Sequence, residues 1–248
     1  LQRKGKRTQA ARILELLRRT VNFGVKRGIC PPLPFKIQIP KLNNQTTEDL
    51  APDQLKRLLN ALDADEDQRV ANIMRIALYT GMRRGEILNL KWSDIDTERG
   101  FITLRDPKGG SDQKIPLSKS ASNVFDKIQP TKGNQFIFPG RYKGAPMAVL
   151  PRKSLDRIRK TAGLSKGFRP LHGLRHVYAS MLASSGQVDM YTLQKLLTHK
   201  SPVMTQRYAH LRDEALRKAS DVAAQIIEQA TAPDDEKGDV IEINSNQN

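Results

Sequence analysis

Two arginines at the start of an expected helix are side chains suited to binding an anion. In the motif TGMRRGE, Gly81 permits a sharp turn, and Arg83 and Arg84 follow it. Two cations at a helix N-terminus oppose the helix dipole, and an anion bound there would resolve that conflict. Glu86 comes three residues after Arg83, so it is spaced to hold that guanidinium in place. The plain alternative is a surface arginine pair with an ordinary ion pair.

A second motif, RPLHGLRHVYAS, combines arginine with histidine. His172 and Arg175 are three positions apart, so the start of a helix would put both on one face. A guanidinium can bind two phosphate oxygens at once, and an imidazole can donate a hydrogen bond or transfer a proton. His176 follows His172 by four positions, a spacing that also allows zinc, but cysteine ligands and a third ligand are missing. We therefore interpret the motif as an anion clamp without metal; a solvated polar helix end is the alternative.

The stretch LLTHKSPVMTQRYAH contains His199 and, nine residues later, Tyr208. An isolated tyrosine near a histidine is most often an ordinary surface residue, yet a phenolate is also a covalent nucleophile. Its reference pKa of ~10 leaves it mostly neutral at pH 7, so neighbouring cations must favour the phenolate. Lys108, in a glycine-rich turn, could bring an ammonium to a phosphate, although such a lysine is usually only solvated, and Lys114 is a rival. His210 receives no role.

Together these side chains are suited to phosphoryl transfer without a metal ion. The arginines supply positive charge that metal ions supply elsewhere, and a lysine can donate a proton to a leaving alkoxide. No carboxylate pair is available for a metal, and no cofactor is expected. The candidate catalytic residues are Arg83, Lys108, His172, Arg175, His199 and Tyr208.

The composition favours a polyanion as partner. The 248-residue chain has a formal net charge of +16, which nucleic acid explains most simply, although a solvated basic surface is the alternative. The one cysteine, Cys30, excludes a disulfide within the chain and fits a reducing compartment. No apolar run approaches the roughly 20 residues of a membrane span, and no signal peptide is visible. Because the chain starts at Leu1 rather than methionine, we expect a fragment or a processed form.

Local patterns predict a mainly helical protein with a few strands. A basic helix near the N-terminus ends at Gly28, and a proline-rich segment follows it. Pro52 is expected to start a helix, an apolar helix ends near Gly81, and Trp92 belongs to the core. Ser201 is expected to cap a late helix. Strands are expected at 101–105, 113–117 and 135–139, and later helices at 152–162, 173–185, 190–197, 202–208 and roughly 212–230.

The chain divides by composition into four segments. The first is too short to be a domain and looks like the end of one, the second has the prolines of a linker, and the last is acidic without a packing pattern, so we expect disorder there. The segments are residues 1–30, the linker 31–45, the main domain 46–230 and the tail 231–248.

The order of the motifs resembles the catalytic domain of the tyrosine recombinases, or phage-type integrases. TGMRRGE, a hairpin lysine, HGLRH, LLTHK and RY follow one another in the family's order. The resemblance extends from Thr46 to Ala230. Two positions depart from the family pattern: Thr198 stands where glycine is common, and Gly173 stands where an acidic residue is common. Neither position supplies a catalytic side chain in the family.

The resemblance implies a role for each candidate residue. Arg83 and Arg175 would bind the scissile phosphate, and Tyr208 would attack it to give a 3′-phosphotyrosyl link and a free 5′-hydroxyl. Lys108 would be the general acid for the leaving oxygen. The supporting residues would be His172, which assists proton transfer, His199, which hydrogen-bonds the phosphate, and Glu86, which supports Arg83 from behind.

The implied fold is mixed α/β and mainly α-helical, with a small antiparallel β-sheet, and residues 1–30 would be the end of a helical core-binding domain. The implied function is a site-specific DNA recombinase that cleaves and rejoins DNA without metal or ATP. DNA relaxation like that of a type IB topoisomerase, and a catalytically silent DNA-binding module, are the alternatives.

The resemblance also implies partners and a setting. The expected partners are double-stranded DNA attachment sites of a phage or mobile element, further copies of the chain in a tetramer on DNA, and accessory DNA-bending proteins. No membrane is expected. The expected localisation is cytoplasmic and nucleoid-associated in a prokaryotic host.

Overall fold

The chain forms two compact units, Leu1–Thr46 and Thr47–Asn248, and each is described by itself. The smaller unit contains α1 (Arg7–Lys26), which ends as predicted just before Gly28, whose positive φ of 69° suits glycine. Its exposed large apolar side chains include Ile13, Leu16, Leu17 and Phe23. The computed structural model describes residues 7–40, 42, 48–105 and 110–231.

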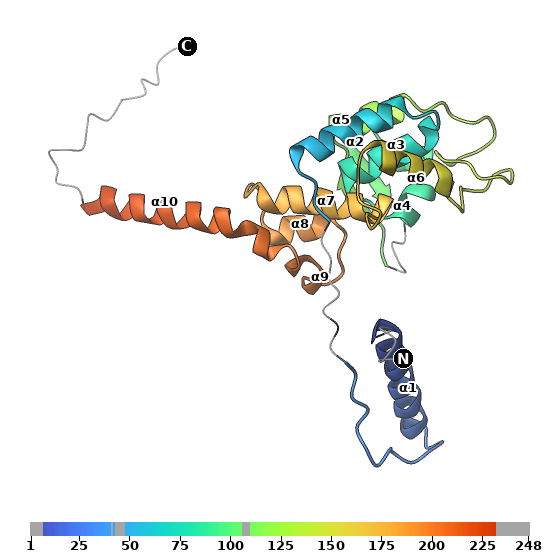
Figure 1. The fold of residues 1–248 in the computed structure, drawn as a ribbon, viewed down its shortest axis with the longest axis vertical. Helices are drawn as coiled ribbons and strands as arrows, with labels where there is room; N and C mark the ends of the chain where they lie inside the picture. Colours follow the sequence, from blue (N-terminus) through green and yellow to red (C-terminus); the bar gives the residue numbers. More distant parts are fainter. Residues whose placement is uncertain (1–6, 41, 43–47, 106–109, 232–248) are drawn as a thin grey trace, which may run out of the picture. The chain divides into compact units, whose positions relative to one another are not determined.

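One buried helix, α3 (Gln68–Thr80), organises the larger unit. Nine of its thirteen residues are buried, so neighbours cover it on nearly all sides rather than along a single face. Asp67 caps the helix by accepting a hydrogen bond from the N–H of Val70, and Gly81 ends it with a φ of 64°. The helices packed against it are α2 (Pro52–Ala64), α4 (Arg84–Leu88), α5 (Lys119–Asp126), α6 (Arg152–Thr161) and α7 (Pro170–Ser184) (Figure 1).

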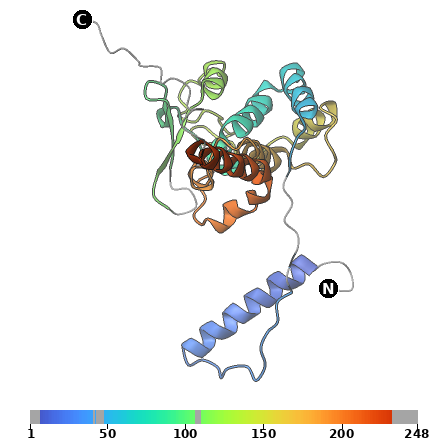
Figure 2. The ribbon, with the colours of Figure 1, turned by 90° about the vertical axis from the view of Figure 1, so that its left-hand side faces the viewer.

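Three short strands form an antiparallel sheet beside these helices (Figure 2). The predicted hairpin is confirmed, because β2 (Phe101–Leu104) pairs with β3 (Gln113–Pro116) and places Ile102 opposite Ile115. Both isoleucines are buried, so a slip of one residue would turn them to solvent. The third strand, β1 (Ile95–Asp96), is too short for a sequence pattern to signal it.

The C-terminal part of the larger unit has a second apolar cluster. Leu193 and Leu197 pack there with Ala179 and Ala183 of α7, and Tyr208 joins the cluster. This packing holds the segment that follows α8, including Tyr208, against α7. The elements of this part are α8 (Met190–Leu196), α9 (Val203–Gln206), the 3₁₀ helix η3 (Ala209–Arg212) and α10 (Asp213–Thr231).

The strand predicted at 135–139 is wrong. Phe136 and Pro139 make only isolated bridges, with Lys91 and Pro146 respectively. A short apolar run is buried whether or not it joins a sheet, and Pro139 cannot donate the hydrogen bond that would extend a ladder. The run was a signal of burial rather than of a strand.

Two helix starts also differ from the prediction. α7 begins at Pro170 rather than Gly173, because proline is well suited to the first helical position, and His172 therefore lies within the first turn. The predicted side-chain cap from Ser201 is wrong: Pro202 itself precedes α9 and has no capping side chain. Helix α5 was not predicted at all, although Ser118 caps it by accepting from the N–H of Ala121.

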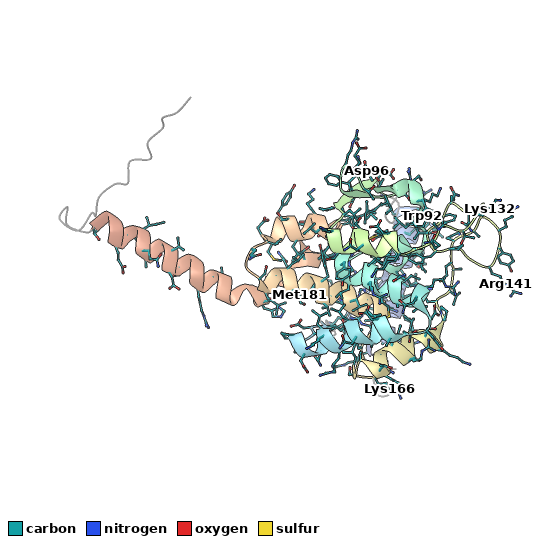
Figure 3. The ribbon with its side chains drawn as sticks, turned by 90° about the horizontal axis from the view of Figure 1, so that it is seen from above. Trp92, Asp96, Lys132, Arg141, Lys166 and Met181 are labelled. Atoms are coloured by element: carbon teal, nitrogen blue, oxygen red, sulfur yellow. The ribbon has the colours of Figure 1, made fainter. Side chains whose placement is uncertain are left out.

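Trp92 lies within the helical body (Figure 3), half-buried and packed against the main core as predicted. Lys132 and Arg141 are exposed and project at its edge in the same view. The indole Nε1 of Trp92 is buried and has no hydrogen-bond partner among the described residues.

In the described part of the chain, no helix is both long enough and apolar enough to cross a bilayer.

Candidate active site

A cavity of about 710 Å³ brings together side chains that lie far apart in the sequence. Its walls include the start of α4, the first two turns of α7, the segment between α8 and α9, and the end of α9. Lys108 lies outside the described residues. The predicted residues that line the cavity are Arg83, Glu86, His172, Arg175, His199 and Tyr208.

Arg175 places a positive charge in a buried position beside the cavity. The residue is only 5% exposed; its Nη1 donates to the Gly81 carbonyl oxygen at 2.5 Å, and its Nη2 donates to the carbonyl oxygen of Leu197. Burial, and then the charge of Arg83, lowers the pKa of Arg175 to about 10. The guanidinium is still charged at pH 7, and carbonyl oxygens do not cancel that charge. The site therefore favours an anion.

Arg83 is held from two sides. Its backbone N–H and its Nη1 donate to the two carboxylate oxygens of Glu86, at 2.7 Å and 2.8 Å. Nη1 also donates to Thr198 Oγ1 at 2.7 Å, and Nη2 donates to the Thr198 carbonyl oxygen at 3.3 Å. Glu86 therefore contacts Arg83 as its spacing predicted, and its negative charge relieves the conflict between a cation and the start of α4. Arg84 instead donates to the Ala148 carbonyl oxygen at 3.0 Å.

His199 follows directly after that threonine. Its Nδ1 is 2.8 Å from Thr205 Oγ1. Burial, and then the charges of Arg175 and Arg83, lowers the pKa of His199 to about 3, so the ring is neutral at pH 7. When the Thr205 hydroxyl donates to Nδ1, the proton of the neutral ring is on Nε2. In that tautomer Nε2–H is available as a donor to an anion in the cavity.

Tyr208 is buried, with only 2% of its surface exposed, rather than lying on the surface. Its Oη is 2.6 Å from Nδ1 of His176, and Nε2 of His176 is 3.2 Å from Nε2 of His172. The hydroxyl and the two rings therefore form a continuous hydrogen-bonded chain whose proton positions depend on the histidine tautomers.

Neighbouring cations favour the phenolate of Tyr208, as expected, but burial has the larger effect on its pKa. Burial raises the pKa of Tyr208, and it outweighs the charges of Arg207 and Arg175, which lower it. The phenol is therefore protonated at pH 7 and needs a proton acceptor before it can act as a nucleophile. His176 can accept that proton at Nδ1, 2.6 Å from the hydroxyl, whereas Arg207, which also hydrogen-bonds Tyr208, can only donate.

A carboxylate lies behind these histidines. Glu48 accepts two hydrogen bonds from Arg169, at 2.6 and 2.7 Å, and its Oε2 is 3.8 Å from Nε2 of His176. Burial raises the pKa of Glu48, but the hydrogen bond and charge of Arg169 outweigh it and hold that pKa below its ordinary value. Burial, and then His172, lowers the pKa of His176 to about 4, while Glu48 opposes that shift.

These neutral histidines predict acid lability. Burial lowers the pKa of His172, His176 and His199 in the fold, so below pH 6.5 the unfolded chain binds protons that the folded chain does not. The free energy of unfolding should be constant above pH 6.5 for these groups and fall by a few kcal/mol as the pH drops towards 4. Urea denaturation at a series of pH values measures it. The slope should be shallower in His176→Gln than in the parent protein, and equal slopes in the two proteins would contradict the account.

The ring nitrogens of His172 and His176 that could bind a metal instead form hydrogen bonds with each other and with Tyr208. The rings of His172 and His176 meet edge to face with centroids 4.6 Å apart, and Nδ1 of His176 faces Tyr208. Across the described ranges, no group of three or more His, Cys, Asp or Glu side chains is arranged to hold a metal ion. Within those ranges, the zinc interpretation of this motif has no further ligands to support it.

Sequence reasoning missed four residues around the cavity. His176 was considered only as a zinc ligand, although its position directly after Arg175 and four residues after His172 already put it near the same face. In the sequence, Thr198 shows only as a departure from glycine. Glu48 carries no sequence signal, because its proximity to the site depends on how distant segments pack. Arg207 is part of the RY motif and lines the cavity, but the motif alone gives it no role.

The comparison with known proteins agrees with this geometry. Residues 48–215 match the model of the Phage integrase family. Tyrosine recombinase XerA of Saccharolobus solfataricus is 33% identical over 180 residues, which are 72% of this chain and 57% of that protein. The chain spans less than two thirds of the length of the XerA relatives it matches.

Solved structures agree as well. The crystal structure of XerA recombinase superposes with a TM-score of 0.56 at 26% identity, covering 86% of this chain and 73% of that one. XerH site-specific recombinase bound to palindromic difH substrate, in a post-cleavage complex, gives a TM-score of 0.57 at 25% identity, covering 73% and 54%. The fold is thus the mixed, mainly helical tyrosine recombinase catalytic fold with a small antiparallel sheet. The chain belongs to the phage integrase family.

Proposed function

We propose that the protein is a site-specific DNA recombinase that cleaves and rejoins DNA through a 3′-phosphotyrosine on Tyr208. One observation carries the proposal. The Tyr208 hydroxyl is hydrogen-bonded to His176 beside a cavity that is also lined by the buried, charged Arg175. A cavity with two guanidinium groups binds a phosphodiester well, and the tyrosine supplies the nucleophile.

The relatives support DNA as the partner. XerH is described in complex with its difH substrate, and the net charge of +16 on this chain suits a polyanion. We further propose that the chain acts on double-stranded attachment sites as a tetramer, with accessory DNA-bending proteins. Residues 1–30 would be the end of a core-binding domain that helps to clamp the DNA. Localisation at the nucleoid in a prokaryotic host follows from the same role.

The proposed cleavage step exchanges one phosphodiester for another. Oη of Tyr208 forms a bond to phosphorus, and the bond from phosphorus to the 5′ oxygen breaks. Arg83 and Arg175 bind the two non-bridging oxygens and stabilise the charge that builds up on them. His199 donates from Nε2 to one of these oxygens. The bond energy is kept in the phosphotyrosine, so a 5′-hydroxyl from a partner duplex can reverse the step without ATP.

The phenol proton needs an acceptor, and we assign it to His176. Nδ1 of His176 is 2.6 Å from the hydroxyl, and transfer would create an imidazolium whose Nε2–H faces Glu48 and His172. The Glu48 carboxylate and the negative charge of a bound phosphodiester both favour that imidazolium, although burial disfavours it. His172 would then pass the proton on, which is the assisting role expected for it.

Lys108 remains the predicted acid for the leaving 5′ oxygen. Lys108→Ala should slow cleavage of an ordinary substrate, and a substrate with sulfur at the 5′ bridging position should restore most of the rate, because a thiolate leaves without a proton. Single-turnover cleavage of matched oxygen and sulfur substrates measures this. If the sulfur substrate restores the rate of Lys114→Ala but not that of Lys108→Ala, the general acid is Lys114 on β3 rather than Lys108.

The proposed function is tested by isolating DNA that stays attached to the protein. The chain is incubated with fragmented DNA from its host, denatured, and stripped of non-covalent DNA before the attached fragments are sequenced. Recovery of fragments that share one sequence at their 3′ ends is the expected result, and it supplies the site for later substrates. Recovery of no attached DNA from the active protein on such a pool would contradict the proposal.

A further inference from the structure

Thr198 has a backbone conformation that its side chain disfavours. Its φ is +50°, and it is the one non-glycine residue in the described ranges with a positive φ. A β-branched residue is unfavourable in this left-handed region, where glycine is free of strain. The residue is also buried, at 6% exposure. Strain of this kind persists only where the surrounding structure holds the residue in place, so the threonine side chain needs a reason to be there.

The hydroxyl of Thr198 supplies that reason. Oγ1 accepts from Nη1 of Arg83 at 2.7 Å, and the backbone carbonyl of Thr198 accepts from Nη2 at 3.3 Å. The residues on either side also serve the cavity, since the Leu197 carbonyl accepts from Arg175 and His199 lines the wall. The left-handed conformation of Thr198 therefore lies in a three-residue segment that contacts both Arg83 and Arg175 and places His199 at the cavity.

A neutral acceptor has an advantage at this position. Glu86 already fixes one side of the Arg83 guanidinium with a full negative charge. A second carboxylate would hold the guanidinium more firmly but would cancel the positive charge that an anion needs. A hydroxyl restricts the long side chain without that cancellation, so the cation is oriented before the anion arrives.

We propose that Thr198 is a positioning residue for Arg83, whose hydroxyl keeps the guanidinium aimed into the cavity at the expense of backbone strain. The inference rests on the proposed function for its effect on cleavage, but the restriction of Arg83 itself can be measured without DNA. Glycine would satisfy the backbone and lose the hydroxyl, which makes the two contributions separable by substitution.

Three substitutions separate the hydroxyl from the backbone. Thr198→Ser keeps Oγ, Thr198→Ala removes it but keeps a Cβ in the left-handed region, and Thr198→Gly removes both the hydroxyl and the strain. Single-turnover cleavage should fall roughly tenfold in the alanine and glycine variants and stay within about threefold in the serine variant. The melting temperature of Thr198→Gly should equal or exceed that of Thr198→Ala, so loss of fold does not account for the loss of rate. Equal cleavage by the serine and alanine variants would overturn the proposal.

A second measurement does not depend on catalysis. Nitrogen-15 NMR of arginine side chains reports how fast the Arg83 guanidinium rotates, with its signal assigned by comparison with Arg83→Lys. Rotation should be slow in the parent protein and Thr198→Ser, and faster in Thr198→Ala and Thr198→Gly. Unchanged rotation in the last two would overturn the positioning role. If instead rotation changes as expected but the parent forms no DNA adduct, the proposed function fails while the assignment of Thr198 stands.

Discussion

Tyr208→Phe is expected to abolish covalent attachment to DNA while leaving DNA affinity within about twofold. The substitution removes only Oη, which is the atom that would bond to phosphorus, and the ring keeps its place against Leu193 and Leu197. His176 loses its partner at Nδ1, so stability should fall by about 1–2 kcal/mol. Adduct formation is read from denaturing gels, and affinity from binding to the same labelled DNA.

Tyr191→Phe is the matched control for that experiment. Tyr191 lies on the neighbouring α8, is 65% exposed and does not line the cavity, so loss of its hydroxyl should leave adduct formation unchanged. A DNA adduct of ordinary yield in Tyr208→Phe would remove Tyr208 from the nucleophile's role. Loss of the adduct in both variants would point to a general effect of losing a hydroxyl rather than to the nucleophile.

Arg175→Lys is expected to slow cleavage by on the order of 10²–10³-fold without unfolding the protein. Lysine keeps a charge, but one ammonium cannot donate to the Gly81 and Leu197 carbonyl oxygens and to two phosphate oxygens together. Sulfate should raise the melting temperature of the parent protein, because an anion relieves the buried charge, and should do so less in the variant. Single-turnover rates and thermal melts with and without sulfate measure both effects.

Arg159→Lys is the matched control for the arginine. Arg159 is similarly buried, at 8% exposure, but it donates to Leu164 and Asp156 away from the cavity. The Arg159→Lys protein should be less stable than the parent, but it should cleave DNA at the same rate and show the same rise in melting temperature with sulfate. If Arg175→Lys cleaves as fast as Arg159→Lys, the buried charge of Arg175 is structural and the anion site lies elsewhere.

Much of the candidate site was predictable because its residues lie in short motifs. The spacing of Arg83 and Glu86 predicts a contact within one helical turn, and the structure has that contact at 2.8 Å. Local spacing does not predict that Arg83, His172, Arg175 and His199 surround one cavity. That expectation rests on the resemblance to the family, which the order of the motifs carries. The distances between these segments follow from the packing of α3, α7 and α8, which no local pattern specifies.

The features that could not be predicted depend on burial and on backbone angles. An exposed Tyr208 was the simplest expectation, yet the smaller apolar cluster covers it, and its pKa rises because burial outweighs nearby cations. Threonine itself gives no signal of the positive φ at position 198, because it is a poor choice for that region. The stretch 135–139 has the pattern of a strand but is not one, because burial and strand patterns coincide in short apolar runs.

The most direct test of the account is to identify the residue that carries the DNA. The covalent adduct is digested with nuclease and protease, and the peptide that retains a nucleotide is sequenced by mass spectrometry. The account predicts a single modified peptide, with the nucleotide joined through its 3′ phosphate to Tyr208. A nucleotide on any other side chain, or DNA cleavage that leaves the peptide containing Tyr208 unmodified, would contradict it.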